Sequence, residues 1–212
     1  MIPFEEIKKY LPQHLSSTAE QELFNELKAF PHNIDQRLYT TYLHNHTNLF
    51  QGDGIQNLLY IHFPDTNVDQ VPGMILSNTC DIDQANKRLM PLRMVYAPII
   101  NLGKYEQSLI KNHVDTDQRS IESINSHIAD IRKQHISHIF YLPKGGQLEN
   151  DSIVFFDRTN NCPANLLEEK SVIRQRIFTL SDYGFYLFLF KLSVHFTRIR
   201  NGVSRTSFRS YN

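Results

Sequence analysis

The hydrophobic pattern changes its period along the chain, and each change predicts a different kind of element. Residues 1–50 read as helical: a capping box runs from Ser17 to Glu20, and three apolar residues follow it at helical spacing. Pro31 is expected to end this helix, and a shorter helix is expected over residues 4–11. Packing on the rest of the domain or on a partner is the expected role of both helices.

Apolar and polar residues alternate from residue 51 onward, which is typical of strands. Strands are expected over residues 55–63, 73–78, 92–100, 138–142 and 152–157. Asp65 to Pro72 reads as a loop, and Gly145-Gly146 as the connection within the last strand pair. Together these elements predict an α+β fold whose antiparallel strands curl into one barrel or half-barrel.

Helical spacing returns in two further segments. Isoleucines recur three and four residues apart within residues 103–134, which predicts a helical insertion between strands. The segment from Ser181 to about Ile199 is apolar on almost every side, which predicts a helix buried in its own core or against a second copy of the chain. A homodimer is therefore expected.

Composition changes this interpretation little, except at the end of the chain. The 212 residues are 41% hydrophobic and 21% charged, which fits one domain with embellishments. Lys plus Arg and Asp plus Glu both total 22, so no overall field attracts nucleic acid. No acidic residue follows Asp182, whereas several basic residues do. This basic end is expected to meet phosphates, an acidic partner or only solvent.

Two cysteines, Cys80 and Cys162, are too few for a disulfide framework. No basic segment precedes an apolar stretch near the first residue, and the most apolar run, beginning at Phe185, is too short to span a bilayer. The expected location is therefore the cytoplasm, with no membrane contact.

Four short motifs, taken in order, resemble the MazF/PemK family of toxin–antitoxin ribonucleases. They are Gly52-Asp53 before the first strand, the VPGMILSNTCD run at 71–81, Ala97-Pro98-Ile99 on the third strand, and the ISHIFYLP, KGGQLEN and DSIVFFDRTN segments of the last strand pair. The resemblance implies a small SH3-like barrel over residues 51–170. Residues 1–50 would then be a helical extension, and residues 171–212 a helix with a basic tail.

The resemblance also implies a function. Family members are typically homodimers that cut single-stranded RNA without a metal, using the 2′-hydroxyl as nucleophile. An arginine before the second-strand proline and a Thr or Ser on the third strand assist them. Here Val71 stands at the arginine position, and the Thr/Ser position aligns with Arg93 or a neighbour. The expectation is therefore RNA binding or cleavage at a non-standard site, with no cofactor. The alternative is an inactive relative that binds an antitoxin or another protein, for example in bacterial defence.

The polar stretch after the second strand is the candidate site. Its candidate catalytic residues are Arg93, Arg88, Cys80 and Thr79, and its candidate substrate-binding residues are Ser77, Asn78, Asp81 and His62. The arginines would hold a phosphate through paired hydrogen bonds. The plainer interpretation is a polar turn in which Asn78 and Thr79 bond to backbone, Asp81 pairs with an arginine and Cys80 only packs. His62 is either a general base or a hydrogen-bonded structural histidine, and the His, Cys and Asp spacings predict no metal site.

Overall fold

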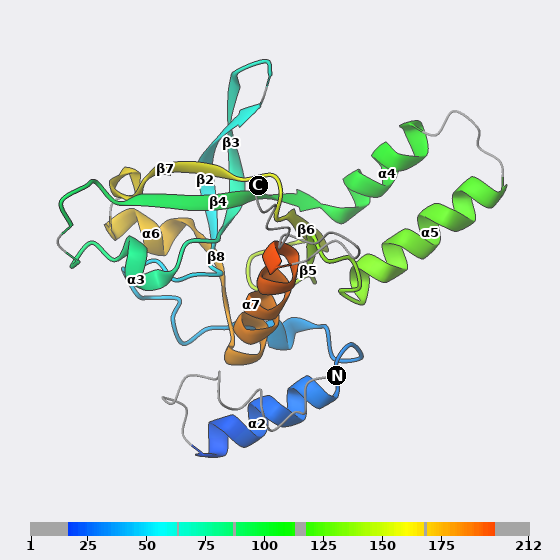
Figure 1. Cartoon of the computed structure of the whole chain (residues 1–212), viewed down its shortest axis with the longest axis horizontal. Coiled ribbons are helices and arrows are strands. Elements are labelled where there is room, and N and C mark those ends of the chain that lie inside the picture. Colours follow the sequence, from blue (N-terminus) through cyan, green and yellow to red (C-terminus); the bar gives the residue numbers. More distant parts are fainter. Residues whose placement is uncertain (1–16, 63, 87, 113–117, 168, 198–212) are drawn as a thin grey trace, which may run out of the picture.

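The computed structural model describes residues 17–62, 64–86, 88–112, 118–167 and 169–197, and within them eight strands form one sheet in which every pair is antiparallel (Figure 1). Along the sheet the order is β1 (Tyr39–Thr40), β8 (Arg176–Leu180), β2 (Gly54–His62), β3 (Asn67–Ile75), β4 (Arg93–Asn101), β6 (Ser152–Phe155) and β5 (Ile139–Leu142), and β7 (Asn160–Pro163) also pairs with β4. The expected α+β fold with antiparallel strands is confirmed. The sheet is not closed into a barrel, because β1 and β5 end the path, and the SH3-like assignment stays a prediction.

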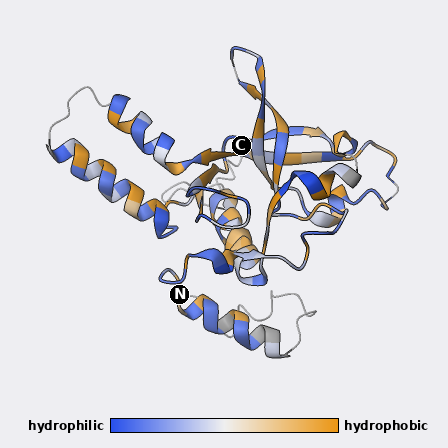
Figure 2. Ribbon diagram, turned by 180° about the vertical axis from the view of Figure 1, so that it is seen from behind, coloured by the Kyte–Doolittle hydropathy of each residue, from blue (hydrophilic) through white to orange (hydrophobic). Residues whose placement is uncertain are grey.

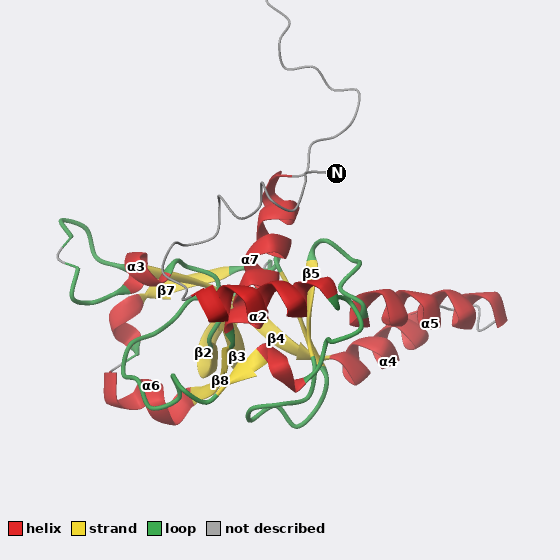
Figure 3. Cartoon of the chain, turned by 90° about the horizontal axis from the view of Figure 1, so that it is seen from below, coloured by secondary structure: helices red, strands yellow, loops and turns green. Residues whose placement is uncertain are grey.

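Six helices accompany the sheet in the described ranges. They are α2 (Ser17–Lys28), α3 (Thr79–Ile82), α4 (Leu102–Asn112), α5 (Gln118–Arg132), α6 (Glu169–Gln175) and α7 (Asp182–Thr197), with 3-10 turns η2 (Gln36–Leu38) and η3 (Ala164–Leu166). The pair α4 and α5 extends to one side of the molecule, and α2 lies beneath α7 (Figures 1 and 3). The helices expected at 17–30, within 103–134 and from 181 are therefore present, and the one expected over 4–11 lies outside the described residues.

One predicted loop is largely strand. Asn67–Pro72 was expected as part of a loop but belongs to β3, which pairs with β2 in a long hairpin. Pro72 is tolerated there because the register shifts between Ile55 and Leu58, so that two residues of β2 lie opposite it. One of them, Asn57, has a φ of 60°, as a bulge allows.

Three hydrophobic clusters fix the sheet to its helices. The largest joins β3, β4, β5, β6 and β8 to α2 and α7, the second lies under α3 and α6, and the third lies between β5, β6 and the α4–α5 pair. Their central side chains are, in turn, Phe140, Phe156 and Phe188; Ile55, Ile75 and Tyr96; Ile128, Ile131 and Ile153. Gly54 permits the close approach of β2 and β8, since a Cβ there would lie 2.4 Å from the Phe178 ring.

Helix α7 is only partly enclosed, although hydrophobic residues occur along its whole length (Figure 2). Phe188 is fully buried in the largest cluster, whereas Phe190 is 65% exposed and Phe196 is 67% exposed. The helix thus buries one face in its own domain, as expected. Whether the other face meets a second subunit stays a prediction.

A buried arginine organises the chain before β2. Arg176, the first residue of β8, is fully buried, and its Nε donates to Asp53 Oδ2 at 3.1 Å. Its Nη atoms donate to four carbonyl oxygens at 2.5–3.0 Å, those of Leu43, His44, His46 and Asn48. Burial raises the pKa of Asp53, and the Arg176 charge opposes this effect. The segment 43–48 is therefore held by one side chain from the far end of the sequence.

A buried lysine joins α7 to the segment that follows α5. Lys191 is 5% exposed, and its Nζ donates to Gln134 O, Gln134 Oε1, Ile136 O and Ile139 O. Burial lowers the pKa of Lys191 to about 7. The Gln134 amide also bonds both ways with the Tyr141 backbone, so this link reaches β5.

Candidate functional site

The polar stretch after β3 folds as a braced turn. Asn78 caps α3, its Oδ1 accepting from the Cys80 amide at 2.9 Å, and Thr79 Oγ1 accepts from the Gln51 amide at 3.0 Å. Ser77 Oγ accepts from the Val95 amide at 2.8 Å, which ties the turn to β4. Three of the predicted substrate or catalytic groups thus already bond to backbone.

The two predicted arginines have partners of their own. Arg88 Nη2 lies 2.6 Å from Asp81 Oδ1, and the Arg93 Nε donates to Asn161 Oδ1 on β7 at 2.7 Å. All of these side chains are exposed enough to exchange partners with a ligand. Cys80 is exposed as well, and its backbone carbonyl accepts from the side-chain Nδ2 of Asn86. These contacts match the plainer interpretation of the stretch, and its catalytic role stays a prediction.

His62 lies apart from the other candidates. It is the last residue of β2, next to the turn of the β2–β3 hairpin, and the hairpin projects away from the rest of the sheet (Figure 1). The His62 Nε2 lies 2.9 Å from Asp69 Oδ2. Ser77 follows the other end of β3, and a strand of 9 residues spans roughly 30 Å. His62 therefore does not share a site with residues 77–81 within one copy of the chain.

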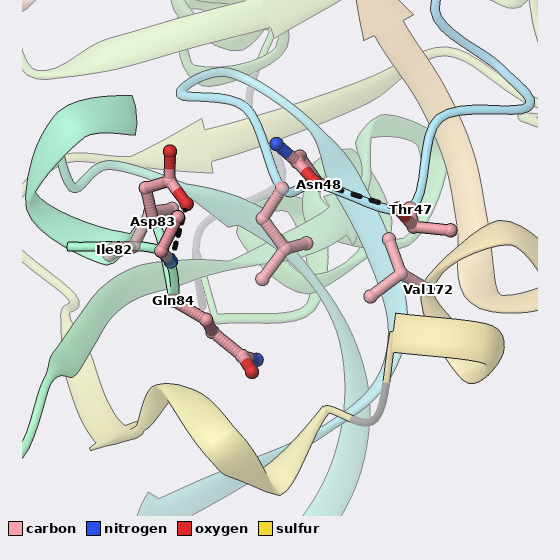
Figure 4. A pocket seen from close by; sticks show the side chains of 8 residues that line it. Thr47, Asn48, Ile82, Asp83, Gln84 and Val172 are labelled. Carbon is pink, nitrogen blue, oxygen red and sulfur yellow. Dashed lines mark hydrogen bonds between the residues drawn. The ribbon is translucent and has the colours of Figure 1, made fainter. Parts of the chain in front are cut away.

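A small hollow of ≈ 140 Å³ lies beside α3 (Figure 4). Its lining combines an apolar floor with amide, hydroxyl and carboxylate groups: Thr47, Asn48, Leu49, Ile82, Asp83, Gln84, Ala85 and Val172. None of these residues is a cation, and Asp83 is acidic. This hollow beside the predicted site is thus poorly suited to a phosphate.

A larger groove, of ≈ 520 Å³, lies where β3, β4 and α4 meet. We call it the Pro72 groove. Its lining is rich in side-chain amides and holds one ammonium and one carboxylate group: Gln56, Pro72, Ile99, Ile100, Asn101, Lys104, Gln147, Leu148, Glu149, Asn150, Ser152 and Ile177. Amides offer both donors and acceptors, so this lining suits a ligand with mixed hydrogen-bonding edges.

Local structure explains why these groups converge. Asn101 ends β4, and its Oδ1 accepts from the Lys104 amide at 2.9 Å, so that α4 starts directly at the groove. Gln147 to Asn150 lie in the turn between β5 and β6, and the Gln147 amide donates to Ile177 O on β8. Gln56 belongs to the β2 bulge opposite Pro72. Strand ends and one bulge thus place polar side chains around a proline.

Sequence reasoning missed the Pro72 groove because its residues come from five separate segments. One signal was available: Asn101 directly follows the strand predicted over residues 92–100 and has N-cap chemistry, which marks a helix start at that strand's end. Comparison of the sequence with protein-family models gives no match, and neither does comparison with curated proteins.

In the described part of the chain, no group of three His, Cys, Asp or Glu side chains lies close enough to hold a metal ion. None of the described helices combines the length and the hydropathy needed to cross a membrane.

Proposed function

We propose that the protein binds single-stranded RNA in the Pro72 groove, as a relative of the MazF/PemK toxins with altered chemistry. The observation that carries the proposal is the position of the groove. It contains Pro72, the second-strand proline beside which the family resemblance implies the substrate-holding arginine. Val71 replaces that arginine, and the groove supplies Lys104 as its cation instead.

The lining supports RNA through two kinds of contact. Lys104, in the first turn of α4, would contact a backbone phosphate as a point charge. The amides of Gln56, Asn101 and Asn150 would pair with the edges of unstacked bases, which single-stranded RNA presents freely. The Asn101 Oδ1 already accepts a hydrogen bond from the Lys104 backbone amide, so the Asn101 Nδ2 is the atom that would donate to a base.

In metal-independent cleavage the 2′-oxygen would attack the phosphorus while a base takes its proton, and the bond from phosphorus to the 5′-oxygen would break as that oxygen takes up a proton. A cation would stabilise the negative charge on the phosphate. Within the groove Glu149 is the carboxylate and Lys104 the cation. Cyclic-phosphate product formed in chelator would support this chemistry. A complex that forms without cleavage would support a binding protein that has lost the reaction together with the arginine.

The test is fluorescence anisotropy with labelled single-stranded RNA, in chelator and at low salt, where phosphate contacts are strongest. Lys104→Ala should weaken binding about tenfold or more, as expected for loss of one hydrogen bond to a charged group. The matched control is Lys111→Ala, which removes an exposed lysine from the last turn of the same helix. The proposal fails if the unmodified protein does not bind, or if both variants lose affinity equally.

The same assay examines the site predicted from the sequence. If Arg93→Ala weakens binding or cleavage and Lys104→Ala does not, the substrate lies at residues 77–93 instead. A larger effect of Cys80→Ser than of Arg93→Ala would indicate thiol chemistry there.

A second candidate function is an interaction subunit, favoured by Val71 at the arginine position and by the existing partners of Arg88 and Arg93. Its test is stoichiometric complex formation with the product of a neighbouring reading frame, measured by size-exclusion chromatography with light scattering. An antitoxin-like partner that displaces RNA would support both functions, whereas a complex without RNA binding would leave the interaction role alone.

A further inference from the structure

Polar side chains from α4, from α5 and from the residue before β5 lie around the buried ring of Phe155, at the end of β6. The Cζ atom of Arg158 lies 4.1 Å from the centroid of the Phe155 ring. The ring of Tyr105 on α4 lies 5.5 Å from it, and that of His138, just before β5, lies 6.1 Å from it. The Nε2 atom of His127, on α5, lies 3.0 Å from the Tyr105 hydroxyl oxygen. We call these five residues the Phe155 cluster.

The cluster has a rigid base. Phe155 is 4% exposed and belongs to the hydrophobic cluster between β6 and the α4–α5 pair. The Arg158 amide donates to Phe155 O at 3.2 Å, closing a tight turn that carries the guanidinium back over its own strand. Stacking of this kind restricts a guanidinium while leaving the hydrogen atoms at its rim accessible.

Arg158 differs from the other arginines of the sheet region. Arg88, Arg93, Arg132 and Arg176 each donate to a side-chain oxygen, three of them within an ion pair with an aspartate. Within the described residues, the exposed Arg158 guanidinium donates no hydrogen bond and forms no ion pair. An ordered guanidinium without an acceptor is suited to bind an oxyanion from outside.

Two neighbouring side chains, Tyr105 and His138, have shifted pKa values. Burial raises the pKa of Tyr105 and the Arg158 charge opposes it, so the phenol stays a neutral donor within electrostatic reach of the guanidinium. Burial lowers the pKa of His138, and the Asp157 carboxylate opposes this effect. Three further groups, His195, His127 and Lys191, lower it as well. Arg158 therefore supplies the positive charge of the cluster, and the Asp157 carboxylate acts on His138 beside it.

We propose that Arg158, together with Tyr105 and His127, forms a binding site for a phosphate group. A planar guanidinium matches two oxygens of a phosphate at once. The Tyr105 hydroxyl and the His127 Nε2 share one hydrogen bond, so when the imidazole donates to the phenol oxygen, the phenol hydrogen can donate to a third phosphate oxygen. The guanidinium charge attracts a doubly charged phosphate more strongly than a singly charged carboxylate. The site does not depend on RNA binding in the Pro72 groove, because no residue of the cluster lines that groove.

The test is isothermal titration calorimetry of the full chain with inorganic phosphate, with ionic strength held constant by sodium chloride. Arg158→Gln should weaken phosphate binding about tenfold or more. Arg158→Lys should lose most of the affinity too, since an ammonium group keeps the charge but not the two parallel donors. The matched control is Arg119→Gln, which removes the same charge from an exposed position near the start of α5 and should stay within about twofold.

Folding is checked separately by thermal unfolding of each variant with and without phosphate. Phosphate should raise the melting temperature of the unmodified protein and of Arg119→Gln but not of Arg158→Lys. A parallel titration with adenosine 5′-monophosphate distinguishes a free phosphate from a phosphorylated ligand, and binding of either supports the site. Absence of binding by both at millimolar concentration, or equal binding by the Arg158 and Arg119 variants, would overturn it.

Discussion

Replacement of Arg176 by methionine should strongly destabilise the fold. The change keeps a long apolar side chain but leaves the buried Asp53 carboxylate without its cation. Removing one member of a buried ion pair typically costs about 3–5 kcal/mol, because an uncompensated charge remains. The four carbonyl oxygens of segment 43–48 also lose their donor, at about 1–3 kcal/mol for each that water cannot reach.

These contributions are not additive, so we expect a loss of at least about 4 kcal/mol in the free energy of unfolding. Asp53→Asn should cost less, about 3 kcal/mol. The guanidinium keeps its four carbonyl acceptors in that variant, and the new amide oxygen still accepts from Phe50 N. The double variant should lose less than the sum of the two single losses, since neither charge is then left unpaired.

Urea unfolding followed by circular dichroism measures all three variants. The control is Arg174→Met, an exposed position on α6 that should change stability by no more than about 0.5 kcal/mol. A loss below about 1 kcal/mol for Arg176→Met would refute the reasoning. The expected loss is a large share of the free energy of unfolding of a typical domain, which is about 5–15 kcal/mol in total. Such a result would mean that segment 43–48 does not depend on the guanidinium.

Two further predictions concern α7. Lys191 has a pKa of about 7 in the folded chain and an ordinary lysine pKa in the unfolded chain. Between these two pH values the unfolded chain binds more protons than the folded chain. The free energy of unfolding should therefore rise with pH, by up to roughly 1.4 kcal/mol per pH unit. Lys191→Met should abolish that rise in urea unfolding at pH 6–10, and an identical pH profile would contradict the assignment. If the expected homodimer forms through α7, Phe190→Arg should lower the mass seen by light scattering without unfolding the chain, whereas Phe188, being fully buried, tests only the core. A monomer for the unmodified protein at high concentration would count against the dimer.

Local pattern predicted most of the elements because their burial is regular. Residues 152–155 and 139–142 are apolar enough to read as strands, and the isoleucines of α5 mark its buried face. Strand β7, with the sequence NNCP, has no alternation to detect, and it becomes a strand only because β4 offers it a partner. Strand β8 begins with an arginine, and only the fold shows that this side chain donates to Asp53 and to four backbone carbonyl groups.

The candidate site was harder to predict for a related reason. Sequence proximity correctly brought Ser77, Asn78 and Thr79 into one turn, but their side chains bond to the nearest backbone groups. Lys104 and Arg158 carried no local signal. They become candidate binding residues only because the strands and helices of the fold bring amides or rings from distant parts of the sequence beside them. The topology determines these neighbours, and residue spacing along the sequence does not show them.

The position of β8 has a consequence for synthesis of the chain. Among the described strands β8 comes last in the sequence, yet it lies between β1 and β2, near the opposite end of the chain. While a ribosome is still adding residues before 176, β1 has no neighbour and one edge of β2 near Gly54 stays open to other chains. Completion of the sheet therefore has to wait for nearly the whole described chain, and pairing over such distances is slow. Nascent molecules of this protein are thus expected to need protection from one another until their final strand emerges.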